Sequence, residues 1–304
     1  MSSLTTNKTL LVVTGPTAVG KTEITTLMAR RLQTHIISAD ARQFYREMKI
    51  GTAFPDDKTL ATVPHHFIGQ LSMHEYYNAA VFEKEALSLL EALFLQHDMV
   101  ILTGGSGLYI DTLCHGIDTM PDHDEEARKK TQALYHDQGI AGLRSLLRQF
   151  DPEYYERADK ANHKRLMRAL EVCFATGQPY SSYRQAVIKE RPFRIRYIVL
   201  NRPRHELFDR INTRVDEMLS DGLIEEAIGL FRFRHLNALN TVGYKEIFAW
   251  LANRLTLQTA VEKIKTNTRR YAKRQLTWFA RYKDAAWFNP DEFENIMDWV
   301  DNDS

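Results

Sequence analysis

Short apolar runs alternate with helical patterns over the first 114 residues of this 304-residue chain. The runs at 9–13, 35–40 and 98–102 each predict a buried strand. Between them, apolar positions within 24–32 and 81–95 recur at the spacing of an amphipathic helix. Strands that alternate with helices favour βαβ units and a parallel sheet. We therefore expect an α/β fold whose ligands bind at the carboxyl ends of the strands.

The pattern changes between residues 120 and 193, where helical spacing continues without a convincing strand. A strand pattern returns at 194–200, and from Arg204 onward the chain is again helical in pattern. The simplest organisation is a helical domain inserted into an α/β core. We predict a core of residues 1–119 and 194–304 with C-terminal helices, and an inserted all-helical domain of residues 120–193.

A phosphate-binding loop lies between the first strand and the first helix. Residues 15–22 fit the pattern G-x-x-x-x-G-K-[ST], in which backbone N–H groups converge on phosphate oxygens. Lys21 adds a positive charge beside a helix amino terminus, and Thr22 offers a hydroxyl suited to Mg²⁺. A ligand-free glycine-rich turn is the alternative, which the strand–loop–helix setting disfavours. The residues expected to hold a phosphate or diphosphate are Gly15, Pro16, Thr17, Ala18, Val19, Gly20, Lys21 and Thr22.

An acidic residue near the loop would distinguish a kinase or ATPase from other enzymes that bind phosphate with such a loop. A P-loop kinase or ATPase usually carries a Mg²⁺-binding acid at the end of a neighbouring strand. The strand ending at Leu102 instead runs into Thr103-Gly104-Gly105. Asp40 is the acid at the end of a predicted strand near the loop, and it could bind metal, cap the backbone or act as a general base.

Composition and charge narrow the class of protein. Apolar residues form 44% of the chain and charged residues 26%, as in ordinary globular proteins, and the net charge is +1. No apolar run approaches the roughly 20 residues of a membrane span, and the first eight residues lack a signal-peptide core. Cys114 and Cys173 suggest neither a disulfide framework nor a metal pair. We expect a cytoplasmic protein without a membrane partner.

Basic residues are concentrated in two segments. Residues 157–214 contain 14 Lys and Arg against 5 Asp and Glu, and residues 263–283 contain 8 and none. Solvated helix faces are the ordinary explanation for such runs. The second segment also interleaves aromatic residues with its cations, a composition that suits phosphate contacts and base stacking in RNA. Nucleic-acid binding is therefore a second interpretation of these segments.

Motifs in a fixed order along nearly the whole chain narrow the function further. Besides the loop at 15–22, they are Ser38-Ala-Asp-Ala-Arg-Gln-Phe-Tyr45, Ile50-Gly-Thr-Ala-Phe-Pro55, Val63-Pro-His-His66, Thr103-Gly-Gly-Ser-Gly-Leu-Tyr-Ile110, Lys164-Arg-Leu-Met-Arg-Ala-Leu-Glu171, Val242-Gly-Tyr-Lys-Glu246, Thr268-Arg-Arg-Tyr-Ala-Lys-Arg-Gln275 and Thr277-Trp-Phe279. Together they resemble the tRNA dimethylallyltransferase family, prenyltransferases that modify adenosine next to the anticodon.

The resemblance implies transfer of a dimethylallyl group from dimethylallyl diphosphate to N6 of the adenosine 3′-adjacent to the anticodon in tRNA. In this family the loop holds the diphosphate. Thr22 would meet Mg²⁺, and Lys21 would offset the charge that grows on the departing diphosphate. Asp40 would accept the N6 proton. Gln43 and Ser106 would hold the target nucleotide, which must leave its stack.

The resemblance also implies further binding residues. Arg210 and Arg214 would lie near the diphosphate. We expect a monomer of bacterial type that uses Mg²⁺ and binds the anticodon stem-loop. The residues expected to contact tRNA are Asp40, Ala41, Arg42, Gln43, Ser106, Arg128, Lys164, Arg165, Leu166, Met167, Arg168, Gly243, Tyr244, Lys245, Lys273 and Arg274.

The chain departs from the family pattern at two places. Gly69 follows the paired histidines where the family usually has Asp, and Asn78-Ala-Ala-Val-Phe82 lacks another frequent Asp. These departures concern a sheet-edge loop and a helix cap, not Asp40. We interpret His65 and His66 as loop structure rather than metal ligands.

Three other functions stay open from the sequence. A small-molecule or nucleotide kinase on the same loop would turn over ATP and would prefer an acid at Thr103. An adenylate isopentenyltransferase would need neither the inserted domain nor the basic segments. A non-enzymatic RNA-binding protein would leave the loop and Asp40 without a purpose.

Overall fold

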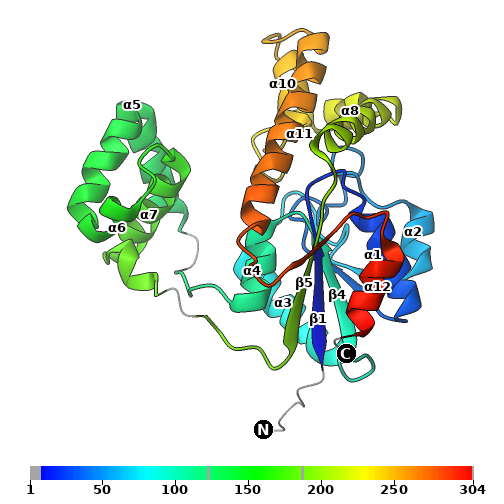
Figure 1. Ribbon diagram of the computed structural model, residues 1–304. Helices are drawn as coiled ribbons and strands as arrows, with labels where there is room; N and C mark the ends of the chain where they lie inside the picture. The colour runs from blue at the N-terminus through cyan, green and yellow to red at the C-terminus, as the bar shows by residue number, and fades with distance from the viewer. Residues whose placement is uncertain (1–7, 122–123, 186–187, 303–304) are drawn as a thin grey trace. The chain divides into compact units, whose positions relative to one another are not determined.

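The computed structural model describes residues 8–121, 124–185 and 188–302 of the chain (Figure 1). The chain divides into two compact units. One unit comprises Met1–Cys114 and Glu190–Ser304, and the other comprises His115–Lys189. Each unit has its own core, so each is described by itself below.

A six-stranded sheet forms the centre of the first unit (Figure 1). Its strands pair in parallel in the order β3-β2-β4-β1-β5-β6. The central strand β1 therefore delivers the phosphate-binding loop between its neighbours β4 and β5. The strands are β1 (Thr9–Thr14), β2 (Ile36–Ser38), β3 (His65–His66), β4 (Met99–Gly104), β5 (Arg194–Leu200) and β6 (Ala286–Phe288).

Helices cover both faces of this sheet because its central strands are apolar on both sides. Leu10 and Val12 of β1 face one core cluster with α3 and α4, whereas Leu11 and Val13 face another with α1 and α12. All four side chains are completely buried. This continuous burial is typical of a parallel sheet between two helical layers. The covering helices are α1 (Lys21–Arg31), α3 (Ala79–Leu93), α4 (Gly107–His115) and α12 (Phe293–Asp301), and the short helix α2 (Asp57–Thr62) packs against α1.

A third core cluster joins the helices that stand at the carboxyl end of the sheet (Figure 1). Val215, Ile247 and Ile264 bring three of these helices together. This group provides the upper wall of the cavity described below. Its members are α8 (Arg204–Ser220), α9 (Leu223–Leu230), the 3₁₀ helices η2 (Phe231–Phe233) and η3 (Asn237–Leu239), α10 (Tyr244–Leu251) and α11 (Leu257–Phe279).

Two short edge strands differ from the sequence expectation. The helical pattern expected from Arg204 onward is interrupted by β6, which pairs with β5. The paired histidines, expected in a loop, form β3 beside β2. Segments of two or three residues are too short to display strand periodicity, so their pairing partners decide their conformation.

The second unit is a helical bundle. α5 packs along α7, and Leu143, Leu147 and Leu170 lie completely buried between them. The buried Asp151 accepts hydrogen bonds from the Tyr154 N–H and from Ser181. Its helices are α5 (Glu125–Phe150), α6 (Pro152–Arg157), α7 (His163–Thr176) and the 3₁₀ helix η1 (Tyr180–Tyr183).

The boundaries of this unit differ from the expected 120–193 by a few residues. Arg191 lies in the first unit because its guanidinium donates to the carbonyls of Leu113 and Thr112 and pairs with buried Glu83 at 2.6 Å. The sequence pattern contains no signal for this long-range attachment. The residues just before β5 therefore belong to the core rather than to the helical unit.

Candidate functional site

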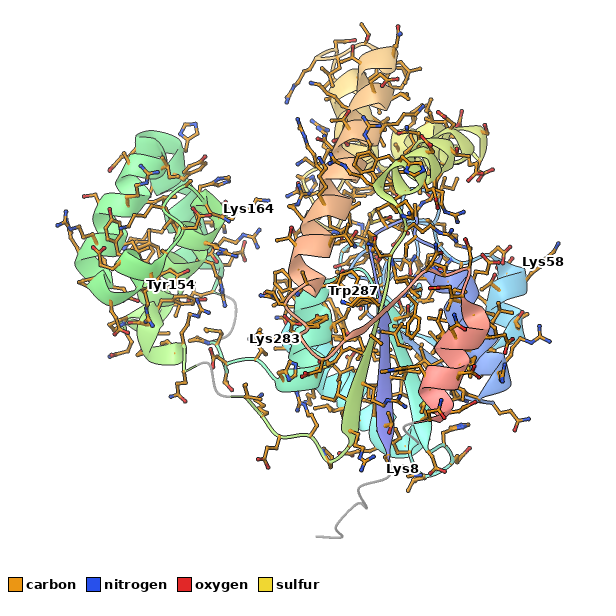
Figure 2. The ribbon with its side chains drawn as sticks, in the orientation of Figure 1. Lys8, Lys58, Tyr154, Lys164, Lys283 and Trp287 are labelled. Carbon is orange, nitrogen blue, oxygen red and sulfur yellow. The ribbon has the colours of Figure 1, made fainter. Side chains whose placement is uncertain are left out.

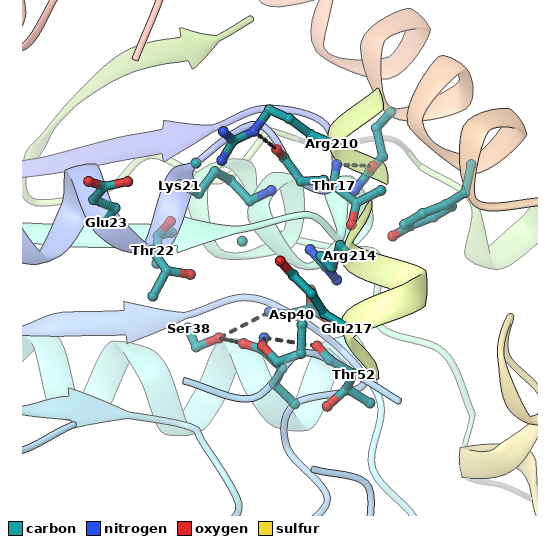
Figure 3. A pocket seen from close by; sticks show the side chains of 18 of the residues that line it. Thr17, Lys21, Thr22, Glu23, Ser38, Asp40, Thr52, Arg210, Arg214 and Glu217 are labelled. Atoms are coloured by element: carbon teal, nitrogen blue, oxygen red, sulfur yellow. Dashed lines mark hydrogen bonds between the residues drawn. The ribbon is translucent and has the colours of Figure 1, made fainter. Parts of the chain in front are cut away.

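A cavity of about 520 Å³ opens at the carboxyl end of the sheet, within the first unit (Figure 3). Lys21, Asp40 and Arg214 project into it from α1, from the turn after β2 and from α8. Its full lining is Thr17, Ala18, Gly20, Lys21, Thr22, Glu23, Ser38, Asp40, Gln43, Thr52, Ala53, Thr103, Gly104, Asp209, Arg210, Thr213, Arg214, Glu217, Tyr271 and Gln275. The cavity thus unites segments that are far apart in the sequence.

The phosphate-binding loop needs glycine at its beginning for steric reasons. Gly15 has φ +151°, and a Cβ atom there would lie only 2.4 Å from the Leu200 carbonyl oxygen of β5. Gly20 has φ +113° and precedes the first residue of α1. The Arg210 side chain donates to the Ala18 carbonyl at 2.9 Å. The structure therefore brings Arg210 to the loop, as the resemblance implies.

Lys21 supplies an ammonium group whose charge is only partly compensated. Its Nζ donates to the carbonyls of Gly15 and Pro16, at 3.0 and 2.9 Å. Burial lowers the pKa of Lys21 to about 8; nearby Asp40 opposes this shift and Arg214 adds to it. Burial also lowers the pKa of Arg214, with Asp40 opposing. A bound phosphate group would oppose both shifts, because a nearby negative charge favours the protonated forms of these two cations.

Asp40 lies on a turn that brings its carboxylate near Lys21 and Arg214. Its Oδ1 accepts the Arg42 N–H at 3.1 Å, and the Ser106 hydroxyl accepts the Ala41 N–H at 3.0 Å. Ser106 therefore shapes the Asp40 turn, and it does not line the cavity. A carboxylate held in this way can accept a proton from a substrate bound in the cavity.

Gln43 lines the cavity but uses its amide N–H groups elsewhere. Its Nε2 donates to the carbonyls of Thr52 and Ala53, at 3.2 and 2.9 Å. Its Oε1 lies 3.5 Å from the Ser38 hydroxyl. Gln43 therefore fixes the wall of the cavity at residues 52–53 and offers a substrate its carbonyl oxygen.

The end of β4 carries no acid. Thr103 occupies the place where a P-loop kinase would carry a Mg²⁺-binding carboxylate, and its hydroxyl donates to the Val13 carbonyl at 3.0 Å. This hydrogen bond holds the two strands together. The Thr103 hydroxyl proton is therefore used within the sheet, and this position supplies no carboxylate to the cavity.

Oxygen donors for a metal ion are few. Thr22 lines the cavity beside Lys21, and Glu23 follows it on α1. Among the described residues there is no group of three or more His, Cys, Asp or Glu side chains that could hold a metal ion. A hydroxyl and separate carboxylates suit Mg²⁺, which commonly binds one or two protein oxygens together with phosphate and water.

Several residues expected at the tRNA are exposed cations. In the first unit these are Lys245, Lys273 and Arg274, whereas Arg42 is half-buried and donates to the carbonyls of η3. In the helical unit, Lys164 and Arg165 are exposed on α7 (Figure 2). The half-buried members of the set are Ala41, Arg128, Met167 and Arg168, the last of which pairs with Glu171 at 3.5 Å.

Burial corrects the expectation for three residues. The side chains of Leu166 and Tyr244 are completely buried, and Gly243 is buried as well. The Tyr244 hydroxyl donates to Glu226 at 2.6 Å, and the Gly243 N–H donates to Glu246. The Leu166 and Tyr244 side chains lie in the cores of their units, and the Gly243 N–H is bonded to Glu246, so we do not expect tRNA contact through these groups.

One residue at the centre of the site was missed from the sequence. Gln275 is only 5% exposed, and its side chain contacts both the phosphate-binding loop and the turn at Gly105. The cations and aromatic rings of residues 263–283 suggest RNA binding and do not point to Gln275. A usable signal was present, because Ala272 and Phe279 lie three residues before and four after Gln275 and indicate a buried helix face.

In the described part of the chain, no helix is both long and apolar enough to span a bilayer. That finding agrees with the hydropathy of the sequence.

Comparison with known proteins gives consistent results. The family described as IPP transferase matches residues 43–282. The chain is 51% identical to tRNA dimethylallyltransferase 1 of Phocaeicola vulgatus, covering 96% of this chain and 97% of that protein. It is 49% identical to tRNA dimethylallyltransferase 1 of Bacteroides fragilis, covering 97% and 98%. The crystal structure of the tRNA isopentenylpyrophosphate transferase from Bacillus halodurans matches with a TM-score of 0.71 at 34% identity, covering 97% and 96%.

Proposed function

This chain belongs to the IPP transferase family, and we propose that it is a tRNA dimethylallyltransferase. The proposed reaction moves the dimethylallyl group of dimethylallyl diphosphate to N6 of the adenosine 3′-adjacent to the anticodon. The observation that carries this assignment is a single cavity lined both by the cations Lys21, Arg210 and Arg214 and by the Asp40 carboxylate. The end of β4 beside it carries no acid that could bind a metal ion.

The cations suit a diphosphate leaving group. Lys21, Arg210 and Arg214 line the same cavity, and Lys21 bonds only to carbonyl oxygens in the described structure. As the bond between C1 of the prenyl group and oxygen breaks, the diphosphate keeps the electron pair. Positive groups fixed beside that oxygen stabilise the developing charge more than they stabilise the bound reactant.

Asp40 suits the role of general base. The lone pair of N6 attacks C1, an N–C bond forms, and one N6 proton passes to the Asp40 carboxylate. An aromatic amine is a weak nucleophile, so a base within hydrogen-bond reach and close positioning of both reactants should supply much of the rate. The target adenine must leave its stack to enter the cavity.

Mg²⁺ is part of the proposal, with Thr22 as the protein residue that would hold it beside the diphosphate. When bound, the ion would neutralise negative charge on the diphosphate. The exposed cations of α7 and α11 are proposed to bind tRNA phosphates, each within its own unit. Because the acceptor is tRNA, the proposal expects a cytoplasmic enzyme, and we keep the expectation of a monomer.

The rival functions explain fewer of these features. A kinase would gain nothing from Thr103, whose hydroxyl is bonded to Val13. An AMP-dependent prenyltransferase would have no use for the exposed cations of the helical unit. A protein that only bound RNA would not need a cavity that pairs cations with Asp40.

A transfer assay tests the proposal. The protein is incubated with labelled dimethylallyl diphosphate, Mg²⁺ and bulk tRNA, and in parallel with AMP. Label in tRNA and not in AMP is the expected result, with N6-dimethylallyladenosine in the digested product. Label in AMP alone, or ATP turnover without transfer, would contradict the proposal.

A further inference from the structure

The side chain of Gln275 lies between the two glycine-rich turns of the site. Its Oε1 accepts the Thr17 N–H of the phosphate-binding loop at 2.8 Å, and its Nε2 donates to the Gly105 carbonyl at 2.9 Å. It is the residue of α11 that bonds to both turns in the described structure. The two bonds use the amide as both acceptor and donor.

The Thr17 bond removes one backbone N–H from phosphate binding. In a phosphate-binding loop such N–H groups ordinarily converge on the ligand. Here the Thr17 N–H is instead tied to α11. Gln275 therefore fixes the loop rather than leaving this donor to the ligand.

The Gly105 bond leads to the proposed base. A Cβ atom at Gly105 would lie 2.3 Å from Gln275 Nε2 and 3.7 Å from Asp40 Oδ2. The backbone at Gly105 therefore lies close to both side chains, and no side chain fits at this position without displacing the Gln275 amide. The Gly105 carbonyl also accepts the Tyr271 hydroxyl, at 3.3 Å. Ser106, the next residue, accepts the N–H of Ala41 beside the base. The turn at Gly105 thus supports the Asp40 turn directly.

Resting on the proposed function, we infer that Gln275 is a positioning residue that sets the separation between the diphosphate loop and Asp40. It touches neither reacting atom. The phosphate-binding loop would hold the leaving group, and the turn at Gly105 supports the base. The Gln275 amide joins this loop to this turn through hydrogen bonds of 2.8 and 2.9 Å, and so fixes the distance between them. The Gln275 side chain is only 5% exposed and its bond to the Gly105 carbonyl is buried, so loss of the amide would remove a hydrogen bond where water does not readily replace it.

Two substitutions separate positioning from simple packing. Gln275→Met keeps the length and removes both hydrogen bonds. We expect kcat to fall about 100-fold, the scale of a 1 Å misplacement, with both KM values within about threefold. Gln275→Glu keeps the shape, and only its protonated form can accept from Thr17 and donate to Gly105 at the same time.

The Glu variant therefore has a characteristic pH profile. Its kcat relative to wild type should rise as the pH falls from 8.5 to 6, by up to about tenfold per unit, because protonation restores the donor. The same titratable and charged groups surround position 275 in wild type, so the ratio removes their common contribution. In the cavity they are Lys21, Glu23, Asp40, Asp209, Arg210, Arg214, Glu217 and Tyr271. The Met variant should give a flat ratio. Gln258→Glu, at an exposed position of the same helix, should match wild type at every pH.

The experiment uses the full chain with labelled dimethylallyl diphosphate and bulk tRNA, and thermal unfolding is recorded at each pH. Unchanged kcat in folded Gln275→Met, or a flat ratio in folded Gln275→Glu, would overturn the inference. Gly105→Ala is a further variant that keeps Gln275 but displaces its amide, and it should lose kcat in the same way. Wild-type kcat in folded Gly105→Ala would also overturn it.

Hydrogen exchange at the Thr17 amide tests the contact without any turnover. We expect protection in wild type and faster exchange in Gln275→Met. Equal exchange rates would refute the bridge even if transfer were never observed. Absence of transfer by wild type would instead contradict the proposed function, so the two hypotheses fail by different measurements.

Discussion

Lys21 makes the affinity for diphosphate depend on pH in a way that the structure predicts. Its ammonium group lies against the carbonyls of Gly15 and Pro16, and burial lowers its pKa to about 8. A bound diphosphate would raise that pKa again, because an opposite charge favours the protonated form. Binding above pH 8 must therefore draw a proton from solution.

The magnitude follows from this pKa. About 90% of Lys21 is neutral at pH 9 in the ligand-free protein, and about 10% is neutral at pH 7. If only the protonated form binds well, the apparent affinity falls about tenfold between pH 7 and pH 9. Uptake on binding should be about 0.9 proton at pH 9 and about 0.1 at pH 7.

Calorimetry in buffers of different ionisation heat measures this uptake directly. Dimethylallyl diphosphate without tRNA is a suitable ligand, because the last ionisation of such a phosphate lies near pH 6 and does not interfere. Lys21→Arg is the matched variant, since a guanidinium stays charged throughout. Wild-type uptake near zero at pH 9, or the same pH dependence in Lys21→Arg, would refute the reasoning.

Three other outcomes follow from the structure. Asp40→Asn keeps the acceptor for the Arg42 N–H but removes the base, so the transfer rate should fall by about 10²–10⁴-fold while the affinity for tRNA is retained. A filter-binding assay beside the transfer assay measures both quantities. An undiminished transfer rate would show that Asp40 is not the base. Lys273→Gln should lower the slope of log affinity for tRNA against log salt by about 1, whereas Lys58→Gln, exposed on α2, should leave it unchanged; equal slopes for wild type and Lys273→Gln would exclude a phosphate contact. His35 Nδ1 lies 2.9 Å from His66 Nε2, and burial is the main cause that lowers the pKa of both rings. Their contribution to the free energy of unfolding should therefore be fully present above about pH 6.5 and should be lost as the pH falls below it. Urea unfolding at pH 7.5 and 5.5 tests this, and a His66→Gln variant that loses as much stability in acid as wild type would contradict it.

One motif of the family resemblance, residues 242–246, contains both a buried structural residue and an exposed cation. The resemblance implies tRNA contact at residues 243–245, yet the Tyr244 hydroxyl donates to Glu226, which also accepts the N–H groups of Ile50 and Gly51. The same motif contributes exposed Lys245. A short motif can therefore contain a structural clamp and a surface cation side by side.

The chain by itself determined the features that depend on neighbouring residues. Apolar runs long enough to be buried on both faces predicted the central strands, including β1, and the loop 15–22 predicted phosphate binding from the order of a few adjacent residues. Asp40 could be identified because it ends the predicted strand 35–40, and parallel strands bring their carboxyl ends to one edge of the sheet. Local sequence is sufficient for such predictions because backbone geometry alone carries the side chain to its place.

Only the tertiary structure decided the features that depend on residues far apart in the chain. The strand β6 is too short to have a periodicity and exists because β5 pairs with it. The helical unit ends where Arg191 finds acceptors at Leu113 and Thr112, about 78 residues earlier. Gln275 gains its place in the site from a loop 258 residues away. Contacts of this range depend on how helices and sheet pack as a whole, and no local pattern records that packing.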